Sequence, residues 1–306
     1  MKIVFFDGVP CRNGEPLDFK GRTGNACTWS YFLREEFHRR GIETDMFGGS
    51  TLVKHPEKIP GGDHVLSVSQ RGFTAYAAKH GIKDMRERLK AKIPGRITSI
   101  CDYSWGGECV EDMIFFARPA VNMANHTYVG WAASPEWLRP EKTGTEYNLL
   151  IDHTLYHKGE DVSASVIKQC FAFNRNNLGD VVIRRFVSGG VETVKGETQM
   201  PAIYDRKGLP YPETCKEYNR ADVFFVTHRE SMGLSVLEAA MAGALIVAPR
   251  EYINKLFLRD LNHVEHDGVI DWDKVVDKLN PEQSRAAALK YNWKNVADKI
   301  LEYFNK

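Results

Sequence analysis

Features that would place a protein in a special class are missing from this 306-residue sequence. The six cysteines are scattered without a Cys-x-x-Cys pair, which argues against a zinc ribbon or a disulfide framework and favours a reducing cytoplasm. No stretch approaches the ~18 apolar residues of a membrane span. The short apolar run at the start of the sequence is typical of a buried strand, not of a signal peptide.

Charge of one sign is also missing. The 41 basic and 40 acidic residues give a net charge of +1, which excludes a whole-protein field that would steer the chain toward nucleic acid or an anionic membrane. What is present is an ordinary globular composition, 43% hydrophobic and 26% charged, in a length that suits about two domains.

Apolar, β-prone runs alternate with amphipathic stretches along the first half of the sequence. This pattern predicts strands at 2–6, 42–47, 64–68, 96–101 and 127–132, with helices near 29–37 and over 74–92. Because a strand–helix–strand crossover is right-handed, the first two strands are expected to be parallel. A doubly wound sheet follows, whose ligands bind beyond the carboxyl ends of the strands.

A polar stretch with Pro and Gly at 138–145 predicts a linker, after which a second alternating series begins. The expected strands are 148–151, 181–186, 223–226 and 245–248, and the expected helices are 161–173, 212–219 and 235–242. The tail 281–306 is expected to form one amphipathic helix. We therefore expect an α/β chain of two Rossmann-like domains, 1–143 and 144–288, with a cleft between them and a terminal helix at 289–306 that packs back on the first domain.

One segment of the second half contains the residues that indicate a binding site. The buried strand 223–226 ends in a loop with Glu230, Ser231 and Gly233, and a helix begins near Leu234. This arrangement turns the loop amides and the positive helix end toward the cleft, where an anionic group such as a diphosphate can bind without a metal ion. Gly233 allows the backbone to approach the ligand closely.

Two carboxylates flank the start of this helix. Glu230 in the loop can accept hydrogen bonds from sugar hydroxyls, and Glu238, one turn into the helix, can hold a vicinal diol such as a ribose. A lone pair of glutamates would more often be solvated helix-face charges. Here the strand, the glycine and the following Ala-Gly-x-x-Val-x-x-Pro sequence occur in register, which favours a site.

Residues 230–249 resemble the Glu-x7-Glu motif of retaining GT-B glycosyltransferases, especially those of family 4. Residues 218–226 and 291–296 are similar to the strand before this motif and to the terminal helix of that family. The resemblance implies a GT-B fold with the nucleotide-sugar, most simply a UDP-sugar, on the second domain and the acceptor on the first. It implies no cofactor and no metal ion.

The resemblance also implies roles for residues outside the motif. Lys158 matches the lysine that neutralises the donor diphosphate, whereas His153 stands where the family has arginine, so the charge there depends on pH. Gly21 and Arg22 lie in a glycine loop that resembles the one facing the donor phosphates, and Asp102 lies where an acceptor-facing residue is common. The implied catalytic set is Glu230, Lys158 and Asp102, and the implied donor-binding set is Gly21, Arg22, His153, Ser231, Met232, Gly233, Leu234 and Glu238.

The sequence thus predicts a metal-independent, retaining glycosyltransferase that moves a sugar to a hydroxyl acceptor. Three alternatives stay open: a phage-type enzyme, like the phage DNA α-glucosyltransferases, acting on hydroxymethylated bases; a GT-B-type nucleotide-sugar epimerase; and an inactive nucleotide-sugar binder. The acceptor could be a small molecule, a glycan or a modified DNA base.

Two further motifs have simpler interpretations. Asp271-Trp-Asp273 has the form of a metal-binding DxD, yet it precedes a helical pattern and is more simply a helix cap with acidic residues in the first turn. The run 79–96 holds seven basic and two acidic residues, which we interpret as a solvated helix face and not as a nucleic-acid surface.

Overall fold

The structure is a computed structural model. It describes residues 1–7, 25–68, 72–101, 110–116, 126–130, 132–141, 144–152, 163–175, 180–187, 190–195, 211–227, 233–253 and 259–306. Contacts between residues divide the chain into two compact units. The described part of the first unit runs from Met1 to Gly130 and resumes at Trp293–Lys306, and that of the second lies within Ala132–Asn292.

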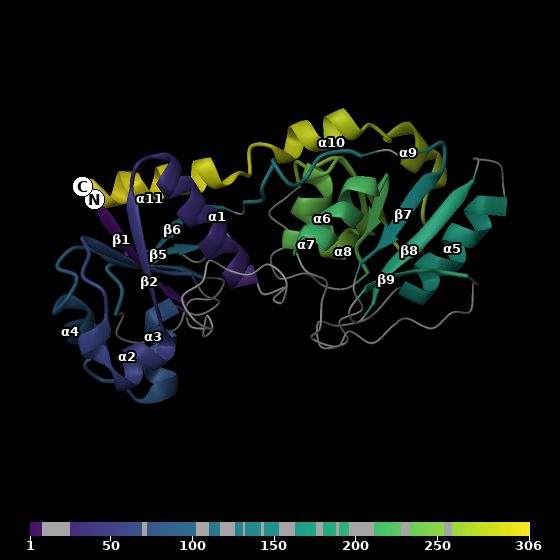
Figure 1. Cartoon of the computed structure of the whole chain (residues 1–306). Coiled ribbons are helices and arrows are strands. Elements are labelled where there is room, and N and C mark those ends of the chain that lie inside the picture. The colour runs from purple at the N-terminus through teal and green to yellow at the C-terminus, as the bar shows by residue number, and fades with distance from the viewer. Residues whose placement is uncertain are drawn as a thin grey trace. The chain divides into compact units, whose positions relative to one another are not determined.

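The first unit is built on a six-stranded parallel sheet (Figure 1). The strand order is β2-β1-β3-β4-β5-β6. The strands are β1 (Lys2–Asp7), β2 (Glu43–Gly48), β3 (His64–Val68), β4 (Ile97–Cys101), β5 (Met113–Phe116) and β6 (His126–Tyr128). The helical elements are α1 (Asn25–Arg39), α2 (Gly49–Lys54), η1 (Pro56–Lys58), α3 (Gly72–His80), α4 (Met85–Lys90) and α11 (Trp293–Phe304).

The β1–α1–β2 unit matches the sequence prediction. Residues 3–6 of β1 are fully buried, as expected of a strand covered by helices on both faces of a parallel sheet. The crossover through α1 leaves β1 and β2 parallel, with Phe5 opposite Met46. The strand β5 was not predicted, because its four residues are too few to show a period.

The prediction of a single helix over 74–92 is wrong, because this part of the chain forms two helices, α3 and α4. Gly81, at φ 65°, ends α3 in the left-handed conformation. The amide of Ile82 then donates to the carbonyl of Ala77 at 3.0 Å, and the Gly81 amide donates to Ala78, which is the Schellman pattern of a helix end. The chain turns before α4 begins at Met85.

The second unit also has a six-stranded sheet, in the order β12-β11-β10-β7-β8-β9 (Figure 1). The strands are β7 (Tyr147–Ile151), β8 (Val181–Val187), β9 (Gly190–Thr193), β10 (Val223–Phe225), β11 (Leu245–Pro249) and β12 (His263–His266). All pairings are parallel except that of β9 with β8. The helices are α5 (Ser163–Arg175), α6 (Tyr211–Arg220), α7 (Leu234–Met241), α8 (Arg250–Ile253), α9 (Trp272–Asp277) and α10 (Pro281–Ala288).

The predicted single helix over 281–306 is also wrong. It is divided into α10, in the second unit, and α11, in the first. Between them the Tyr291 carbonyl accepts a hydrogen bond from the Ala133 amide at 3.0 Å, and Asn292 forms a bridge with Ala133. These contacts hold the backbone in an extended course that a continuous helix would not permit.

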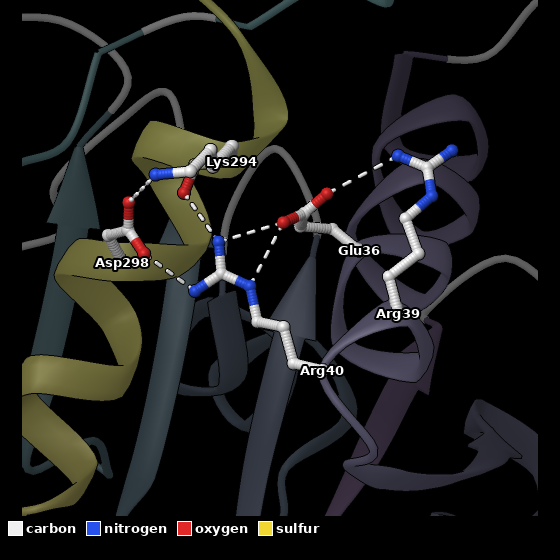
Figure 2. A network of polar contacts seen from close by, with 5 residues as sticks. All are labelled: Glu36, Arg39, Arg40, Lys294 and Asp298. Atoms are coloured by element: carbon white, nitrogen blue, oxygen red, sulfur yellow. Dashed lines mark hydrogen bonds and ion pairs between the residues drawn. The ribbon is translucent and has the colours of Figure 1, made fainter.

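The helix α11 packs on α1 through rings and through charges. The ring of Trp293 lies 5.6 Å from that of Trp29, edge to face. Beside these rings, Arg40 donates to Glu36 at 2.8 Å and to Asp298 at 2.6 Å (Figure 2). Because such partly exposed ion pairs contribute about 0–1 kcal/mol each, the buried rings supply most of the attachment.

The polar stretch expected to join two domains lies within the second unit. The Asn219 side chain of α6 accepts from the Arg139 amide at 3.0 Å and donates to the Trp137 carbonyl at 3.1 Å. The Glu141 amide donates to the Asn219 carbonyl at 2.7 Å. One residue of α6 thus fixes the path of this stretch.

The predicted fold class is confirmed: the chain is α/β, with two Rossmann-like units. The basic run over 79–96 is largely engaged inside the first unit, since Arg86 pairs with Asp112, Arg88 pairs with Asp84, and Arg96 lies over the Tyr303 ring. Within the described residues, no helix is long and apolar enough to span a bilayer.

Candidate donor site at the start of helix α7

The carboxyl edge of the second sheet has a topological switch between β7 and β10. From β7 the chain moves outward to β8 and β9, and it then returns to β10 on the other side of β7. The two neighbouring strands end level, with Ile151 opposite Phe225, and the Asp152 amide donates to the Phe225 carbonyl at 3.0 Å. In open parallel sheets, ligands bind in the crevice that forms beyond the strand ends at such a point.

The helix α7 begins at this edge. Gly233 precedes it with φ 72° and ψ 38°, a left-handed conformation that glycine adopts without a steric penalty. The first helical hydrogen bond runs from the Leu237 amide to the Gly233 carbonyl. The amides of residues 234–236 therefore have no acceptor within the helix, and among the described residues no side chain caps them. Free amides at the positive end of a helix bind anions.

A buried aspartate ties this helix start to the sheet. The Ser235 hydroxyl donates to Asp152 Oδ2 at 3.3 Å, and Asp152 is only 2% exposed. Ser235 is the second residue of α7 and Asp152 directly follows β7, so the contact positions the first turn over the switch point. The sequence analysis missed Asp152, although an aspartate directly after a buried strand could have been found.

Glu238 lies in the second turn of α7 and is 5% exposed. The Tyr211 phenol and the Cys215 thiol, both on α6, are near enough to its carboxylate to feel its charge. Burial raises the pKa of Glu238 to about 8, and the nearby Tyr211 hydroxyl acts in the opposite direction. Burial, together with the charge of Glu238, raises the pKa of the Tyr211 phenol and of the Cys215 thiol.

The other end of α7 is fixed by close packing. Gly243, at φ 103°, has no room for a side chain, since a Cβ there would lie 2.7 Å from Pro140 and 3.2 Å from Pro281. The Arg285 guanidinium of α10 donates to the Met241 carbonyl at 2.6 Å and to the Pro135 carbonyl at 3.0 Å. These contacts explain the Ala-Gly sequence of the motif, and they hold the helix axis in place.

The structure brings together three of the residues predicted for the donor site. Gly233, Leu234 and Glu238 all lie in the segment that starts and forms α7. The remaining predicted residues lie outside the described ranges, and their roles stay predictions: Gly21, Arg22, Asp102, His153, Lys158, Glu230, Ser231 and Met232.

A second buried carboxylate, which the sequence analysis did not single out, lies in the first unit. Glu111, 3% exposed, accepts from the Phe73 amide at 2.6 Å, the Thr74 amide at 3.2 Å and the Ser99 hydroxyl at 2.7 Å. The Thr74 hydroxyl also donates to it. Glu111 thus occupies the positive end of α3, which leaves that helix start unsuited to an external anion.

The described residues hold no group of three or more acidic, histidine or cysteine side chains that could bind a metal ion. The interpretation of Asp271 as a helix cap is confirmed. Its side chain accepts from the Lys274 amide at 3.2 Å at the start of α9.

Comparison with known proteins identifies the architecture. No protein-family model and no curated protein matches the sequence. Solved structures do match over nearly the whole chain. Sucrose-phosphate synthase from Thermosynechococcus elongatus is 11% identical at a TM-score of 0.62, covering 99% of this chain and 98% of its own. AviGT4, a glycosyltransferase involved in avilamycin A biosynthesis, is 14% identical at 0.57, covering 99% and 97%.

A third match is an α-glucosyltransferase in complex with UDP and a 13-mer DNA containing an HMU base. It is 12% identical at a TM-score of 0.55, and the match covers 100% of both chains. The likeness to these three proteins is one of overall fold. The chain has the GT-B fold. In this GT-B chain, α7 and β11 lie within residues 230–249, which carry the Glu-x7-Glu resemblance, and β10 precedes them.

Proposed function

We propose that this GT-B chain is a glycosyltransferase that takes a sugar from a nucleotide-sugar, most simply a UDP-sugar, and transfers it to a hydroxyl acceptor. The observation that carries the proposal is the start of α7 at the switch point of the second sheet: a left-handed Gly233, amides that no side chain of the described residues caps, and a first turn bonded to Asp152. The Glu-x7-Glu sequence runs through this same segment.

In this proposal the amides at the start of α7 receive the donor diphosphate. They act together with Ser231 and Met232 of the preceding loop, with Lys158 and His153, and with Gly21 and Arg22. As the glycosidic bond breaks, negative charge develops on the leaving diphosphate, and fixed N–H groups stabilise that charge without reorganising. Such donors need no metal ion between protein and phosphate.

The two glutamates have different tasks. Glu230 accepts hydrogen bonds from the sugar and positions it, whereas Glu238 accepts the ribose hydroxyls of the nucleotide. Asp102 faces the acceptor. The resemblance implies retention of configuration: the acceptor oxygen attacks from the face that the diphosphate leaves, its proton passes to the leaving phosphate, and a nucleoside diphosphate is released. The paired carboxylates of glycoside hydrolases are then not needed.

The test is to incubate the protein with a panel of nucleotide-sugars, with and without acceptors, and to measure nucleoside diphosphate release and the sugar products. The acceptors should include monosaccharides, oligosaccharides and duplex DNA with hydroxymethylated bases. We expect nucleoside diphosphate release that depends on one acceptor. An isomerised nucleotide-sugar formed without acceptor would instead indicate an epimerase, and binding without either product would indicate an inactive binder.

A further inference from the structure

A threonine at the carboxyl end of β10 has a buried hydroxyl without a partner. Thr227 lies two residues beyond the end of β10, and the backbone before it is still extended, since the Val226 amide donates to the Val247 carbonyl of β11 at 2.9 Å. The Thr227 side chain is 0% exposed. Its hydroxyl oxygen is shielded from solvent and has no hydrogen-bond partner among the residues that the structure describes. The sequence analysis did not single out this residue.

The alternation of side chains along β10 gives the side of the sheet on which Thr227 lies. Val223 and Phe225 pack in one buried cluster with Val166 of α5. Because successive side chains of a strand point to opposite faces, Thr227 continues the series of Val223 and Phe225 on the α5 side. Its hydroxyl therefore lies at the carboxyl edge of the second sheet, beside the end of β7.

Asp152 marks the other side of the same switch point. It directly follows β7, and the Ser235 hydroxyl of α7 donates to it at 3.3 Å. Since α5 follows β7 and α7 follows β10, the two helices leave the strand ends on opposite sides of the sheet (Figure 1). A crevice for a ligand forms between such strand ends, with Asp152 and Thr227 at its floor. Asp152 is bonded to Ser235, whereas the Thr227 hydroxyl is unpaired among the described residues.

A shielded polar group without a partner is costly, and in native structures it marks a catalytic role or a missing water, ion or ligand. Other buried polar atoms of the described residues also lack a partner, among them Ser30 Oγ in α1, Trp293 Nε1 in α11 and His266 Nε2 at the end of β12. The first two belong to the first unit, and β12 is two strands away from β10. Among these orphaned atoms, the Thr227 hydroxyl is the one that follows a strand of the switch point.

We propose that Thr227 is a further donor-binding residue, whose hydroxyl donates a hydrogen bond to a diphosphate oxygen of the nucleotide-sugar. The proposal rests on the proposed function, which assigns the diphosphate to the start of α7.

The chemistry of the two groups suits this contact. A threonine hydroxyl carries one donor, and an ionised phosphate oxygen is an acceptor whose hydrogen bonds are stronger than those between neutral groups. The amides of α7 hold the diphosphate from one side of the crevice, and Thr227 holds it from the floor. Because the shielded hydroxyl has neither water nor a protein partner, the new bond replaces no existing one, which offsets the cost of displacing the side chains that cover it.

The experiment compares wild-type protein with Thr227→Val by isothermal titration calorimetry. UDP, ADP and GDP are titrated, and the tightest binder is used for both proteins. Valine has nearly the shape of threonine but no hydroxyl, so affinity for the nucleoside diphosphate should fall by about tenfold. Affinity for the matching nucleoside, measured by displacement of the diphosphate, should stay within about twofold. The melting temperature should be unchanged or higher, because an unpaired buried hydroxyl is removed.

Two further variants make the comparison specific. Thr227→Ser keeps a hydroxyl and should bind the nucleoside diphosphate within about threefold of wild type. Thr98 in β4 is also 0% exposed, but its hydroxyl donates to the Val65 carbonyl at 3.0 Å. Thr98→Val makes the same chemical change in the first unit and should have the opposite result: a lower melting temperature, because the Val65 carbonyl loses a donor, and unchanged nucleotide affinity.

The outcomes separate this inference from the proposed function. If wild-type protein binds no nucleoside diphosphate, the proposed function fails and the inference with it. If wild-type protein binds one and Thr227→Val binds it equally well, the donor site stands and the role of Thr227 is overturned. An equal loss of affinity for the nucleoside, or a loss that Thr227→Ser shares in full, also overturns it, because the hydroxyl then makes no contact specific to phosphate. Should Thr227→Val not fold, Thr227→Ala is measured in its place with the same expected affinities.

Discussion

The starts of α3 and α7 look alike and are used differently. Each helix follows a parallel strand, β3 or β10, and each is entered through a buried glycine in the left-handed conformation, Gly72 at φ 69° and Gly233 at φ 72°. At α3 the free amides are satisfied by Glu111. At α7 no side chain among the described residues caps them.

This difference shows how one motif serves two purposes. A strand–glycine–helix turn creates a positive helix end wherever it occurs. A carboxylate of the same chain that accepts from these amides gives the end a structural role, as Glu111 does at α3, whereas amides without such an acceptor can bind an anionic ligand. The proposed donor site therefore lies at α7, and α3 serves as the internal comparison.

The largest expected effect is a loss of catalysis when residues proposed to bind the donor near the start of α7 are replaced. Glu230→Ala and Lys158→Ala should each lower nucleoside diphosphate release by about 100-fold or more, because each removes a contact to the donor as charge develops. Glu238→Ala should mainly weaken nucleotide binding. The measurement is turnover with the best donor and acceptor, and thermal melting checks that the variants stay folded. Full activity in Glu230→Ala would remove the role assigned to that residue.

The next largest effect is a loss of stability when Glu111, which bonds the first amides of α3, is replaced. Glu111→Ala should lower the free energy of unfolding by about 3 kcal/mol, because it leaves buried amides and hydroxyls without an acceptor. Glu111→Gln keeps one acceptor oxygen and should lose about half as much. Urea denaturation measures both variants. Nucleoside diphosphate affinity, measured under native conditions, should be unchanged in each, and a loss of affinity would contradict the separation of the two helix starts.

The two glycines give a direct comparison. A Cβ at Gly72 would lie 2.7 Å from Glu111 Oε1 and 3.0 Å from the Ser99 hydroxyl, so Gly72→Ala adds a steric clash to the cost of a left-handed alanine. Gly233→Ala carries the conformational cost of about 1–2 kcal/mol. We expect Gly72→Ala to lose more stability in urea denaturation, and Gly233→Ala alone to weaken nucleotide binding. Equal losses of binding in both would refute the comparison.

The smallest effect is a pH dependence at Glu238. Its pKa of about 8 in the folded protein lies above the ordinary value of 4.5, so the folded state binds an extra proton between these limits. The stability contributed by the neutral carboxyl is complete below about pH 4.5 and is lost as pH rises through 8. Ribonucleotide affinity should rise as pH passes through about 8, because Glu238 of the folded protein ionises there and an ionised carboxylate is the better acceptor. Glu238→Gln should remove both slopes, and slopes that persist in it would assign them to another group.

The sequence predicted the elements whose signals are local. The strand at 64–68, the β1–α1–β2 unit and the elements β10, α7 and β11 all have clear apolar patterns, and the structure has the strands and α7 within one or two residues at each end, whereas α1 begins four residues before the predicted helix. The predicted helices over 74–92 and 281–306 were wrong because an amphipathic period continues across a break. At Gly81 the signal was visible in the sequence. At residues 289–292 it was not, because the backbone there bonds to Ala133, far away in the chain.

The same distinction applies to the site. Gly233, Leu234 and Glu238 were predicted because they fall within one continuous motif. Asp152 and Glu111 were not, because each acquires its partner only when separate elements pack: Ser235 for Asp152 and the start of α3 for Glu111. A period along one segment carries no information about such pairings.

A crystal structure of the protein with a bound nucleoside diphosphate tests the central claim most directly. The account predicts diphosphate oxygens within hydrogen-bonding distance of the amides at Leu234 and Ser235, with the ribose at Glu238. A diphosphate bound elsewhere, with the start of α7 facing solvent, would contradict it.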